Sequence, residues 1–396
     1  MSAGETGPDP LEVLARRSLP EQVRTAEHGL RLLPEMDAVL GTIQRDVERA
    51  TRRVLVETYI YRDDRLGRGF ADSLARAAAR GVDVRLIYDP LGSNHTPTSF
   101  FEALCARGVN ARAYRPPSTF LGGGSVFPRD HSRVIVVDDH AYTGGAAWGD
   151  EWLPKRLGGE GWHDVCMQVE GPSVDDFARL FEMRWREATG EIEVPKDLDR
   201  GQAYPELELL ADAPSRVDLV YERHLEAIHA ARERVWMCNA YFYPPSAMRD
   251  ALFDAAARGV DVQVVSTGET DLPIVKRAAR ADHAYWIRRG LRIFEYQKGL
   301  LHAKYALFDR DLCTVGTLNA NPTSMKLANE VNVFVSEPAF VQRVAELFAS
   351  DRSDSREVSL DEALRRPILE RIADNLACDA LHLVDALFGP RARGKG

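Results

Sequence analysis

The octapeptide AAARGVDV occurs at Ala77–Val84 and again, letter for letter, at Ala255–Val262. Eight matched positions are too many to attribute to composition, so we interpret them as part of an internal repeat that decides the fold. Apolar stretches precede both copies, VLVETYIY at Val54–Tyr61 and VWMCNAYFY at Val235–Tyr243. Each stretch is typical of a buried strand that ends in an aromatic turn.

Helices and further strands follow in the same order in both copies. Gly81 and Gly259 supply the left-handed residue that ends a helix. Strands that alternate with helices predict an α/β fold with two similar halves, each a mostly parallel sheet flanked by helices. The sequence predicts helices at Gly69–Arg80 and Ser246–Arg258, and strands at Val82–Tyr88 and Val260–Val265.

Composition shifts along the chain predict where the two halves begin and end. We expect an N-terminal extension over residues 1–34, partly disordered, because its first part is rich in proline and mixed charge. The remaining expected parts are a first half at 35–190, a polar linker at 191–214, a second half at 215–355 and a C-terminal helical segment at 356–396.

Composition also limits the class of function. The 396 residues contain 60 Asp and Glu against 51 Lys and Arg, a net charge of −9. An acidic chain is a poor candidate for sequence-blind nucleic-acid binding, which needs many Lys and Arg contacts to phosphates. No apolar run approaches the roughly 18 residues of a membrane-spanning helix, and no export signal opens the chain. We therefore expect a cytoplasmic protein.

Two short motifs place a histidine beside a cation. The triplet HAK at 302–304 precedes the apolar run YALF, and His131-Ser-Arg133 precedes VIVV. Side chains alternate along a strand, so His302 and Lys304 share one face, as do His131 and Arg133. Asp138 and Asp309 follow at the same spacing, and Asp164 and Glu330 begin matching strands further on.

Two imidazoles, each beside a fixed cation, suit the chemistry of a phosphodiester. One imidazole attacks phosphorus, the other protonates the leaving oxygen, and the cations hold the nonbridging oxygens. A single motif of this kind recurs by chance. His131 by itself would be interpreted as a surface histidine with Arg133 in a salt bridge, but the second copy at the equivalent point of the repeat favours a site.

These motifs resemble the phospholipase D superfamily, whose signature is HxKxxxxD followed by a GSxN-type turn in each half. The resemblance spans about residues 35–360 and is strongest to bacterial cardiolipin synthases. YTGGAAWGDEWL at 142–153 is similar to their glycine-rich turn and GDEY segment. GTLNANPTS at 316–324 and ANEVN at 328–332 are similar to their second-half motif.

The resemblance implies two halves about a pseudo-twofold axis and a double displacement through a phosphohistidine, without metal or cofactor. It makes His131 the nucleophile and His302 the general acid, with the roles exchangeable between two chemically similar groups. The other implied site residues are Arg133, Lys304 and Asn319 on phosphate, Asp164 and Glu330 on the imidazoles, and Asp138, Asp309, Gly145 and Thr317 in support.

The first half departs from the family pattern at two positions. Arg133 replaces the usual lysine, and Ala147 stands where the family usually has asparagine. Arginine keeps the charge but has a longer, planar head group. Alanine removes a polar contact, and the loss of one such donor costs on the order of 10²–10³ in rate where charge develops. We expect an active enzyme with an altered rate or substrate preference.

The predicted function is a phospholipase D-type phosphodiesterase or phosphatidyltransferase, similar to cardiolipin synthases, that acts on phospholipid or another phosphodiester. Such a protein would contact the inner membrane face peripherally. One alternative is a nuclease of the same superfamily, which the acidic charge disfavours. Another is a catalytically silent phosphodiester-binding protein, which the departures at Arg133 and Ala147 favour. The oligomeric state is left open.

Three other features were open to two interpretations. Gly122–Gly124 suggests a flexible lid rather than a phosphate loop. The segment 366–389 has a helical apolar face, and we expect packing on the second half rather than on a bilayer, because its polar face is acidic. The aromatic residues that would either line a substrate channel or pack in the core are Phe101, Trp148, Trp152, Tyr241, Phe242 and Tyr243.

Overall fold

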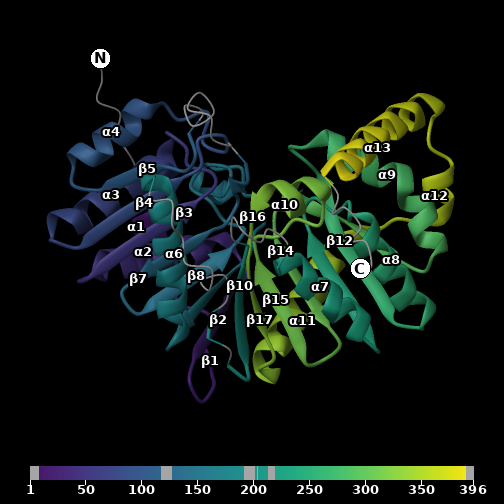
Figure 1. Ribbon diagram of the computed structural model, residues 1–396, viewed down its shortest axis with the longest axis horizontal. Coiled ribbons are helices and arrows are strands. Elements are labelled where there is room, and N and C mark those ends of the chain that lie inside the picture. The colour runs from purple at the N-terminus through teal and green to yellow at the C-terminus, as the bar shows by residue number, and fades with distance from the viewer. Residues whose placement is uncertain (1–8, 117–126, 191–200, 203, 213–218, 389–396) are drawn as a thin grey trace, which may run out of the picture. The chain divides into compact units, whose positions relative to one another are not determined.

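A computed structural model of the protein describes residues 9–116, 127–190, 201–202, 204–212 and 219–388. The chain forms two compact units, with the boundary between Leu209 and Leu210 (Figure 1). Each unit contains one eight-stranded sheet with helices packed on it, so the predicted α/β fold with two similar halves is confirmed.

The sheet of the first unit has the spatial order β1-β2-β9-β8-β7-β3-β4-β5. Only β3–β4 and β4–β5 pair in parallel, while the other neighbours are antiparallel. The sheet is therefore mixed, and the prediction of a mostly parallel sheet was wrong in this detail. The strands are β1 Val23–Arg24, β2 Gly29–Leu33, β3 Arg53–Thr58, β4 Asp83–Tyr88, β5 Asn110–Ala113, β7 Val134–Val137, β8 His140–Gly144 and β9 Cys166–Glu170.

The sheet of the second unit repeats this plan in the order β10-β17-β15-β14-β11-β12-β13-β18. Strand β12 again pairs in parallel with β11 and β13, while β14, β15 and β17 are antiparallel. The strands are β10 Leu207–Ala211, β11 Arg234–Asn239, β12 Asp261–Glu269, β13 Arg292–Leu300, β14 Lys304–Phe308, β15 Leu312–Gly316, β17 Val331–Val335 and β18 Ser355–Glu357.

The antiparallel part of each sheet has a simple cause. Strand β7 turns back into β8 through the two residues Asp138 and Asp139, and β14 turns back into β15 through a three-residue loop that begins at Asp309. Such short connections can join only antiparallel strands, since a parallel pair needs a crossover of a dozen residues or more. Helices α3 (Arg65–Ala79) and α8 (Ser246–Ala257) supply such crossovers in the parallel part of each sheet.

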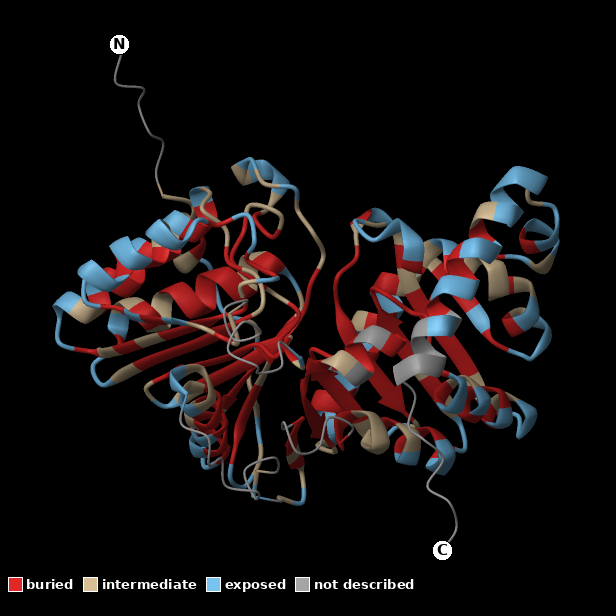
Figure 2. Cartoon of the chain, turned by 45° about the horizontal axis from the view of Figure 1, so that its top comes forward, coloured by how far each residue is buried: buried red, intermediate tan, exposed pale blue. Residues whose placement is uncertain are grey.

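Helices cover the sheets, and their inner faces are buried while their outer faces are exposed (Figure 2). In the first unit they are α1 Pro10–Ala15, α2 Met36–Arg49, α3 Arg65–Ala79, α4 Thr98–Ala106, the 3-10 turn η1 Lys155–Leu157 and α6 Ser173–Thr189. In the second unit they are α7 Leu219–Ala230, α8 Ser246–Ala257, α9 Pro273–Arg288, α10 Pro322–Leu327, α11 Pro338–Ser353, α12 Leu360–Leu364 and α13 Ile368–Phe388.

The repeated octapeptide forms the same helix end in both units. Gly81 has φ +88° and Gly259 has φ +89°, and nothing lies within 4 Å of a Cβ added at either position. Glycine is needed there for its backbone conformation and not for space. Behind it, the Val82 amide donates to the Ala77 carbonyl, and the equivalent bond in the second unit joins the amide of residue 260 to the carbonyl of residue 255.

Three expected boundaries differ from the structure. The expected extension at 1–34 contains α1, β1 and β2, and β2 pairs with β9 inside the first sheet. The expected linker at 191–214 contains β10, and the expected C-terminal segment at 356–396 begins inside β18, which pairs with β13. These edge strands are short and show no alternation of their own, so only pairing with a distant partner specifies them.

Candidate functional site

The second unit places its histidine and lysine side by side at the start of β14. Lys304 Nζ lies 2.9 Å from His302 Nδ1 and also donates to the His302 carbonyl oxygen. Both side chains are buried, 3% exposed for His302 and 2% for Lys304. Tyr241, at the end of β11, meets the imidazole edge-on, and Lys304 Nζ lies 5.8 Å from the centre of the same ring. The shared face expected from strand alternation is therefore observed.

The turn after β15 brings further polar groups to the same end of the sheet. Asn319 is buried, and within the described part of the chain no hydrogen-bond donor reaches its Oδ1. Its backbone is held by the Asn239 side chain, which donates to the Leu318 carbonyl and accepts from the Ala320 amide. These contacts join the turn to β11 and fix where Asn319 lies.

Glu330 occupies a fully buried position between two hydroxyl groups. Thr317 donates to one carboxylate oxygen and Ser324 donates to the other. Thr317 is thus a direct partner of Glu330, in line with the supporting position proposed for it. Ser324 was not singled out in the sequence, although it is the last residue of the matched segment at 316–324; it lies in α10.

The first unit repeats the arrangement with arginine in place of lysine. Arg133 Nη1 lies 3.1 Å from His131 Nε2 and donates to the His131 carbonyl oxygen at 2.8 Å. Tyr59, just after β3, meets the imidazole edge-on at 5.0 Å between centroids, and the Arg133 guanidinium carbon lies 5.9 Å from its ring centre. Tyr59 was not singled out in the sequence, although its match with Tyr241 at the strand ends is the signal that identifies it.

Asp164 is fully buried, like Glu330, but it has different neighbours. The indole Nε1 of Trp152 donates to Asp164 Oδ2 at 2.9 Å, and the Val165 amide donates to Oδ1 at 2.9 Å. Gly145 lies directly against the carboxylate, since a Cβ added there would be 2.2 Å from Asp164 Oδ1. Gly145 therefore makes room for the Asp164 carboxylate. Its counterpart Thr317 instead donates a hydrogen bond to Glu330.

Asp138 and Asp309 lie at the far end of β7 and β14 and organise turns. The Asp138 carboxylate accepts from the backbone amides of residues 51, 52 and 53, and Asp309 accepts from those of residues 232, 233 and 234. These amide donors are among the causes that lower the pKa of both carboxyl groups, against desolvation by burial, which raises it. Both residues have positive φ, +48° and +53°, a conformation that aspartate tolerates.

A buried group of charges lies next to His131 in the first unit. Arg184 Nε lies 3.8 Å from both Glu57 Oε1 and Asp130 Oδ1, and all three side chains are inaccessible to solvent. Burial raises the pKa of Asp130 to about 6, opposed by the charge of Arg184, and burial together with the nearby Asp130 carboxylate raises the pKa of Glu57 well above its usual value. Sheet pairing puts Cys238 at the position of Glu57 in the second unit.

Most aromatic residues considered for a channel belong to the core. Trp152 is fully buried against Asp164, Trp148 stacks on Phe70, and Phe101 stacks on Tyr88. Phe242 and Tyr243 are buried in the core cluster of the second unit, which leaves Tyr241 as the one in contact with a site histidine. The Tyr241 hydroxyl donates to Asp271 at 2.6 Å.

Gly122–Gly124, the predicted lid, lies outside the described residues. Among residues that the structure does describe, no group of three or more His, Cys, Asp or Glu side chains is arranged to hold a metal ion. In the same part of the chain, no helix is long and apolar enough to cross a bilayer.

Comparison with known proteins identifies the family. A family model described as "Cardiolipin synthase, PLD-like domain" matches residues 43–185 and again residues 224–352. The chain belongs to the phospholipase D superfamily. The two matches coincide with the two copies of the repeat, and each contains one His-x-cation motif of the superfamily signature.

Relatives within the phospholipase D superfamily carry a consistent name. Cardiolipin synthase A of Pseudomonas fluorescens is 33% identical over 361 residues, which are 89% of this chain and 74% of that protein. Cardiolipin synthase 2 of Bacillus anthracis is 29% identical over 352 residues, 87% of this chain and 68% of that one. In fold, the chain is similar to the phosphatidylserine synthase of Haemophilus influenzae, with a TM-score of 0.71 at 13% identity over 96% of this chain and 98% of that chain.

Proposed function

We propose that this protein is a phosphatidyltransferase of the phospholipase D superfamily, similar to cardiolipin synthases, that works through a covalent phosphohistidine. The observation that carries the proposal is the pair of imidazole–cation contacts, His131 with Arg133 and His302 with Lys304, at equivalent strand starts of a repeated fold. The relatives named cardiolipin synthase support phosphatidylglycerol as both donor and acceptor.

In the first step, a ring nitrogen of His131 attacks the phosphorus of phosphatidylglycerol. A P–N bond forms, the P–O bond to glycerol breaks, and protonated His302 gives its proton to the departing glycerol oxygen. In the second step, His302 takes the proton from a hydroxyl of a second phosphatidylglycerol. That oxygen attacks phosphorus, the P–N bond breaks, and cardiolipin leaves.

The surrounding residues have distinct parts in this proposal. Arg133 and Lys304 hold the nonbridging oxygens, where negative charge grows in both transition states. Asn319 donates from its amide nitrogen to the phosphate, and its buried Oδ1 accepts from a hydroxyl of the glycerol. Asp164 and Glu330 position the imidazoles, and water in place of the acceptor lipid gives phosphatidic acid.

The proposed reaction requires both histidines to reach one phosphorus atom. Because the substrate is a lipid, we infer that the protein works at a membrane surface, peripherally and at the cytoplasmic face. The reaction as proposed uses no metal or cofactor, so a chelator is expected to leave the rate unchanged.

Lipid mass spectrometry tests the function. Purified protein is incubated with mixed phospholipid vesicles and glycerol, and we expect cardiolipin, phosphatidic acid or an exchanged headgroup with wild type but not with His131→Ala or His302→Ala. The matched control is His140→Ala, because His140 pairs with Asp46 and Glu170 on β8 away from the motif. Equal product from wild type and the two site variants would refute the proposal.

A catalytically silent phosphodiester-binding protein is the second candidate, favoured by Arg133 and by the buried Ala147, which offers no side-chain donor. It predicts binding of phospholipid without any acid-stable or transient adduct on His131. Rapid denaturation at alkaline pH, which preserves the acid-labile P–N bond, followed by peptide mapping separates the two candidates, since only the transferase forms a phosphohistidine.

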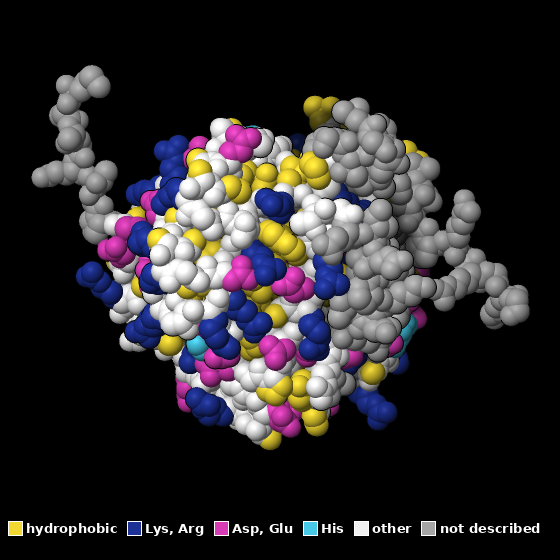
Figure 3. Space-filling model, turned by 60° about the vertical axis from the view of Figure 1, so that its left-hand side comes forward, with side chains coloured by type: hydrophobic (Ala, Val, Ile, Leu, Met, Phe, Trp, Pro, Cys, Tyr) yellow, Lys and Arg dark blue, Asp and Glu magenta, His cyan; other side chains and the backbone are white. Residues whose placement is uncertain are grey.

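A nuclease would need a continuous basic channel for a single strand. On the face of the molecule drawn in Figure 3, Lys and Arg side chains are interspersed with Asp and Glu and form no such track. Cleavage of single-stranded DNA without lipid turnover in the same assay would nevertheless replace the lipid proposal.

A further inference from the structure

Helix α13 presents a row of large apolar side chains to solvent. Ile368, Leu369, Ile372 and Leu376 are between 52% and 78% exposed, and Leu383 is 59% exposed. At 3.6 residues per turn, these positions lie on one side of the helix. The sequence predicted that this apolar face packs on the second half, and the structure shows the reverse for these residues. The side chains of Val384 and Leu387, on the same expected face, are not described.

The opposite side of α13 packs on the second unit. Ala377, Cys378 and Leu381 are buried in its core, and α13 lies along α9 (Figure 1). Two acidic residues of the helix pair with arginines of the same unit. Buried Asp374 is paired with Arg366 and with Arg277 and Arg280 of α9, and the exposed Glu370 is also paired with Arg280. These arginines balance part of the acidity that argued against a bilayer helix.

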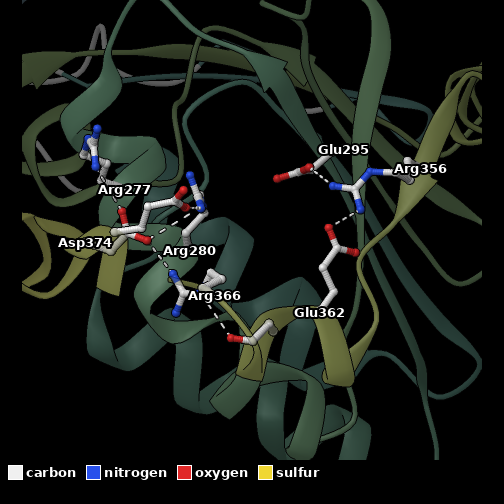
Figure 4. A network of polar contacts seen from close by, with 9 residues as sticks. Arg277, Arg280, Glu295, Arg356, Glu362, Arg366 and Asp374 are labelled. Carbon is white, nitrogen blue, oxygen red and sulfur yellow. Dashed lines mark hydrogen bonds and ion pairs between the residues drawn. The ribbon is translucent and has the colours of Figure 1, made fainter. Parts of the chain in front are cut away.

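A cationic cavity of about 200 Å³ lies at the N-terminal end of α13. Four of its lining residues are cations and two are carboxylates, Glu295 and Glu362. In Figure 4, charged side chains project from α9, β13, β18, α12 and the residues before α13 around this space. The cations are Lys276, Arg280, Arg356 and Arg366.

A buried histidine also lines this cavity. The pKa of His283 is lowered to about 3, first by burial and then by the same four cations. Those four lining cations outnumber the two lining carboxylates, Glu295 and Glu362, which both pair with Arg356. The excess of cations suits an anion, and the cavity volume exceeds what one phosphate group needs.

The apolar row and the cavity are neighbours. Arg366 lines the cavity, and two residues away on either side lie Leu364, 44% exposed, and Ile368, 71% exposed. Nine of the twelve most exposed large apolar side chains in the described residues fall within 272–285 and 364–383. Such a gathering marks an interaction surface rather than ordinary scatter.

We propose that α13, α12 and the start of α9 form a docking surface for a bilayer that contains anionic phospholipid. The apolar row enters the acyl boundary, and the cavity receives the phosphate of one lipid headgroup. A bilayer fits better than a protein partner because its surface supplies apolar chains and anionic phosphates side by side. The surface begins close to the second-unit histidine, because Tyr241 contacts His302 and donates to Asp271 just before α9, but its test does not depend on the transferase proposal.

Vesicle co-sedimentation tests the apolar row. Full-length protein is mixed with vesicles of phosphatidylcholine and phosphatidylglycerol in equal amounts, without measuring turnover. The double variant Leu369→Glu with Leu376→Glu is expected to weaken binding roughly tenfold or more, because two apolar side chains no longer leave water. The matched control is Leu19→Glu with Leu91→Glu, two exposed leucines of the first unit, which should bind as wild type does.

The cavity is tested by a second pair of double variants with equal charge change. Lys276→Gln with Arg356→Gln removes two lining cations, and Arg292→Gln with Lys298→Gln removes two cations of β13 that do not line the cavity. We expect the first pair to lower binding to phosphatidylglycerol vesicles about three- to tenfold and the second to have a smaller effect. Circular dichroism melts check that every variant is folded.

Two results would overturn the proposal. One is undiminished vesicle binding by folded Leu369→Glu with Leu376→Glu. The other is light scattering that shows a dimer which the same substitutions dissociate, together with no binding of wild type to vesicles, because the apolar row would then belong to a second copy of the chain.

Discussion

The two histidine sites share a backbone plan but differ in their side chains. In the second unit, Lys304 sits beside His302, and hydroxyl groups of Thr317 and Ser324 hold Glu330. In the first unit, Arg133 sits beside His131, and an indole and a backbone amide hold a shorter carboxylate. Both units therefore keep a cation beside the histidine and a buried carboxylate nearby, but the groups that donate to the carboxylate differ.

The exchange between Gly145 and Thr317 shows how this works. Thr317 reaches across to the longer Glu330, whereas a Cβ at Gly145 would overlap the carboxylate of Asp164. A glycine and an aspartate therefore replace a threonine and a glutamate as a pair. Gly145 by itself would suggest that the carboxylate has lost the donor that Thr317 supplies in the second unit. Asp164 obtains a donor from the Trp152 indole instead.

The largest expected effect separates the roles of the two histidines. His131→Ala should remove turnover and the covalent adduct, while His302→Ala should slow turnover by about 10²–10⁴ and let the adduct on His131 accumulate. Quenched-flow labelling with a radioactive lipid donor measures both quantities. An adduct on His302 in the His131→Ala protein would reverse the assignment of the two halves.

The next test concerns the phosphate-binding side chains, since the second unit has both a cation and the Asn319 amide while the first has Ala147 in place of the asparagine. Asn319→Ala should lower kcat by about 10²–10³, the cost of one donor to developing charge. Lys304→Arg should also lower activity strongly, because Lys304 is 2% exposed and a longer head group does not fit there. Arg133→Lys should cost less than tenfold. Equal losses from Lys304→Arg and Arg133→Lys would contradict this asymmetry.

A smaller effect concerns stability and pH, and it is confined to the first unit. The pKa of Asp130 is about 6 in the folded protein against an ordinary value of 3.8, so the folded state binds more protons between these values. The contribution of Asp130 to the free energy of unfolding therefore falls as the pH rises from about 4 to about 6. Relative to wild type, Asp130→Asn should gain about 1–3 kcal/mol of unfolding free energy across that window.

Urea unfolding of both proteins at several pH values measures the difference. Cys238→Ala serves as the control, because Cys238 occupies the position of Glu57 in the second unit and carries no carboxyl group. A difference between Asp130→Asn and wild type that stays constant with pH would show that the buried charge group does not behave as described.

The smallest effect should be the same in both halves. Asp138→Asn and Asp309→Asn keep the positive φ but weaken the bonds from three backbone amides, so each should cost about 1 kcal/mol of unfolding free energy. Thermal melts measure the loss, and lipid turnover per folded molecule should not change. A loss of turnover in only one of the two variants would place that aspartate closer to the chemistry than its turn.

Much of the fold and part of the site could be predicted from the sequence for a physical reason. The repeat shows directly which segments are equivalent, and strand alternation puts His302 with Lys304 and His131 with Arg133 on shared faces, as the structure confirms. Tyr59, Ser324 and the indole of Trp152 were not predicted as partners, since their contacts join segments that no local pattern relates.

The sequence by itself determined the α/β repeat, the glycine-terminated helices and the identity of the two histidine motifs, because all of these depend on local periodicity and spacing. The mixed sheets, the edge strands that extend both units, the exposure of the apolar row of α13 and the pairing of Asp374 with Arg366 come from tertiary contacts that no local pattern shows. Those outcomes depend on which distant groups meet, and the buried Asp374 carboxylate is tolerated because arginines reach it.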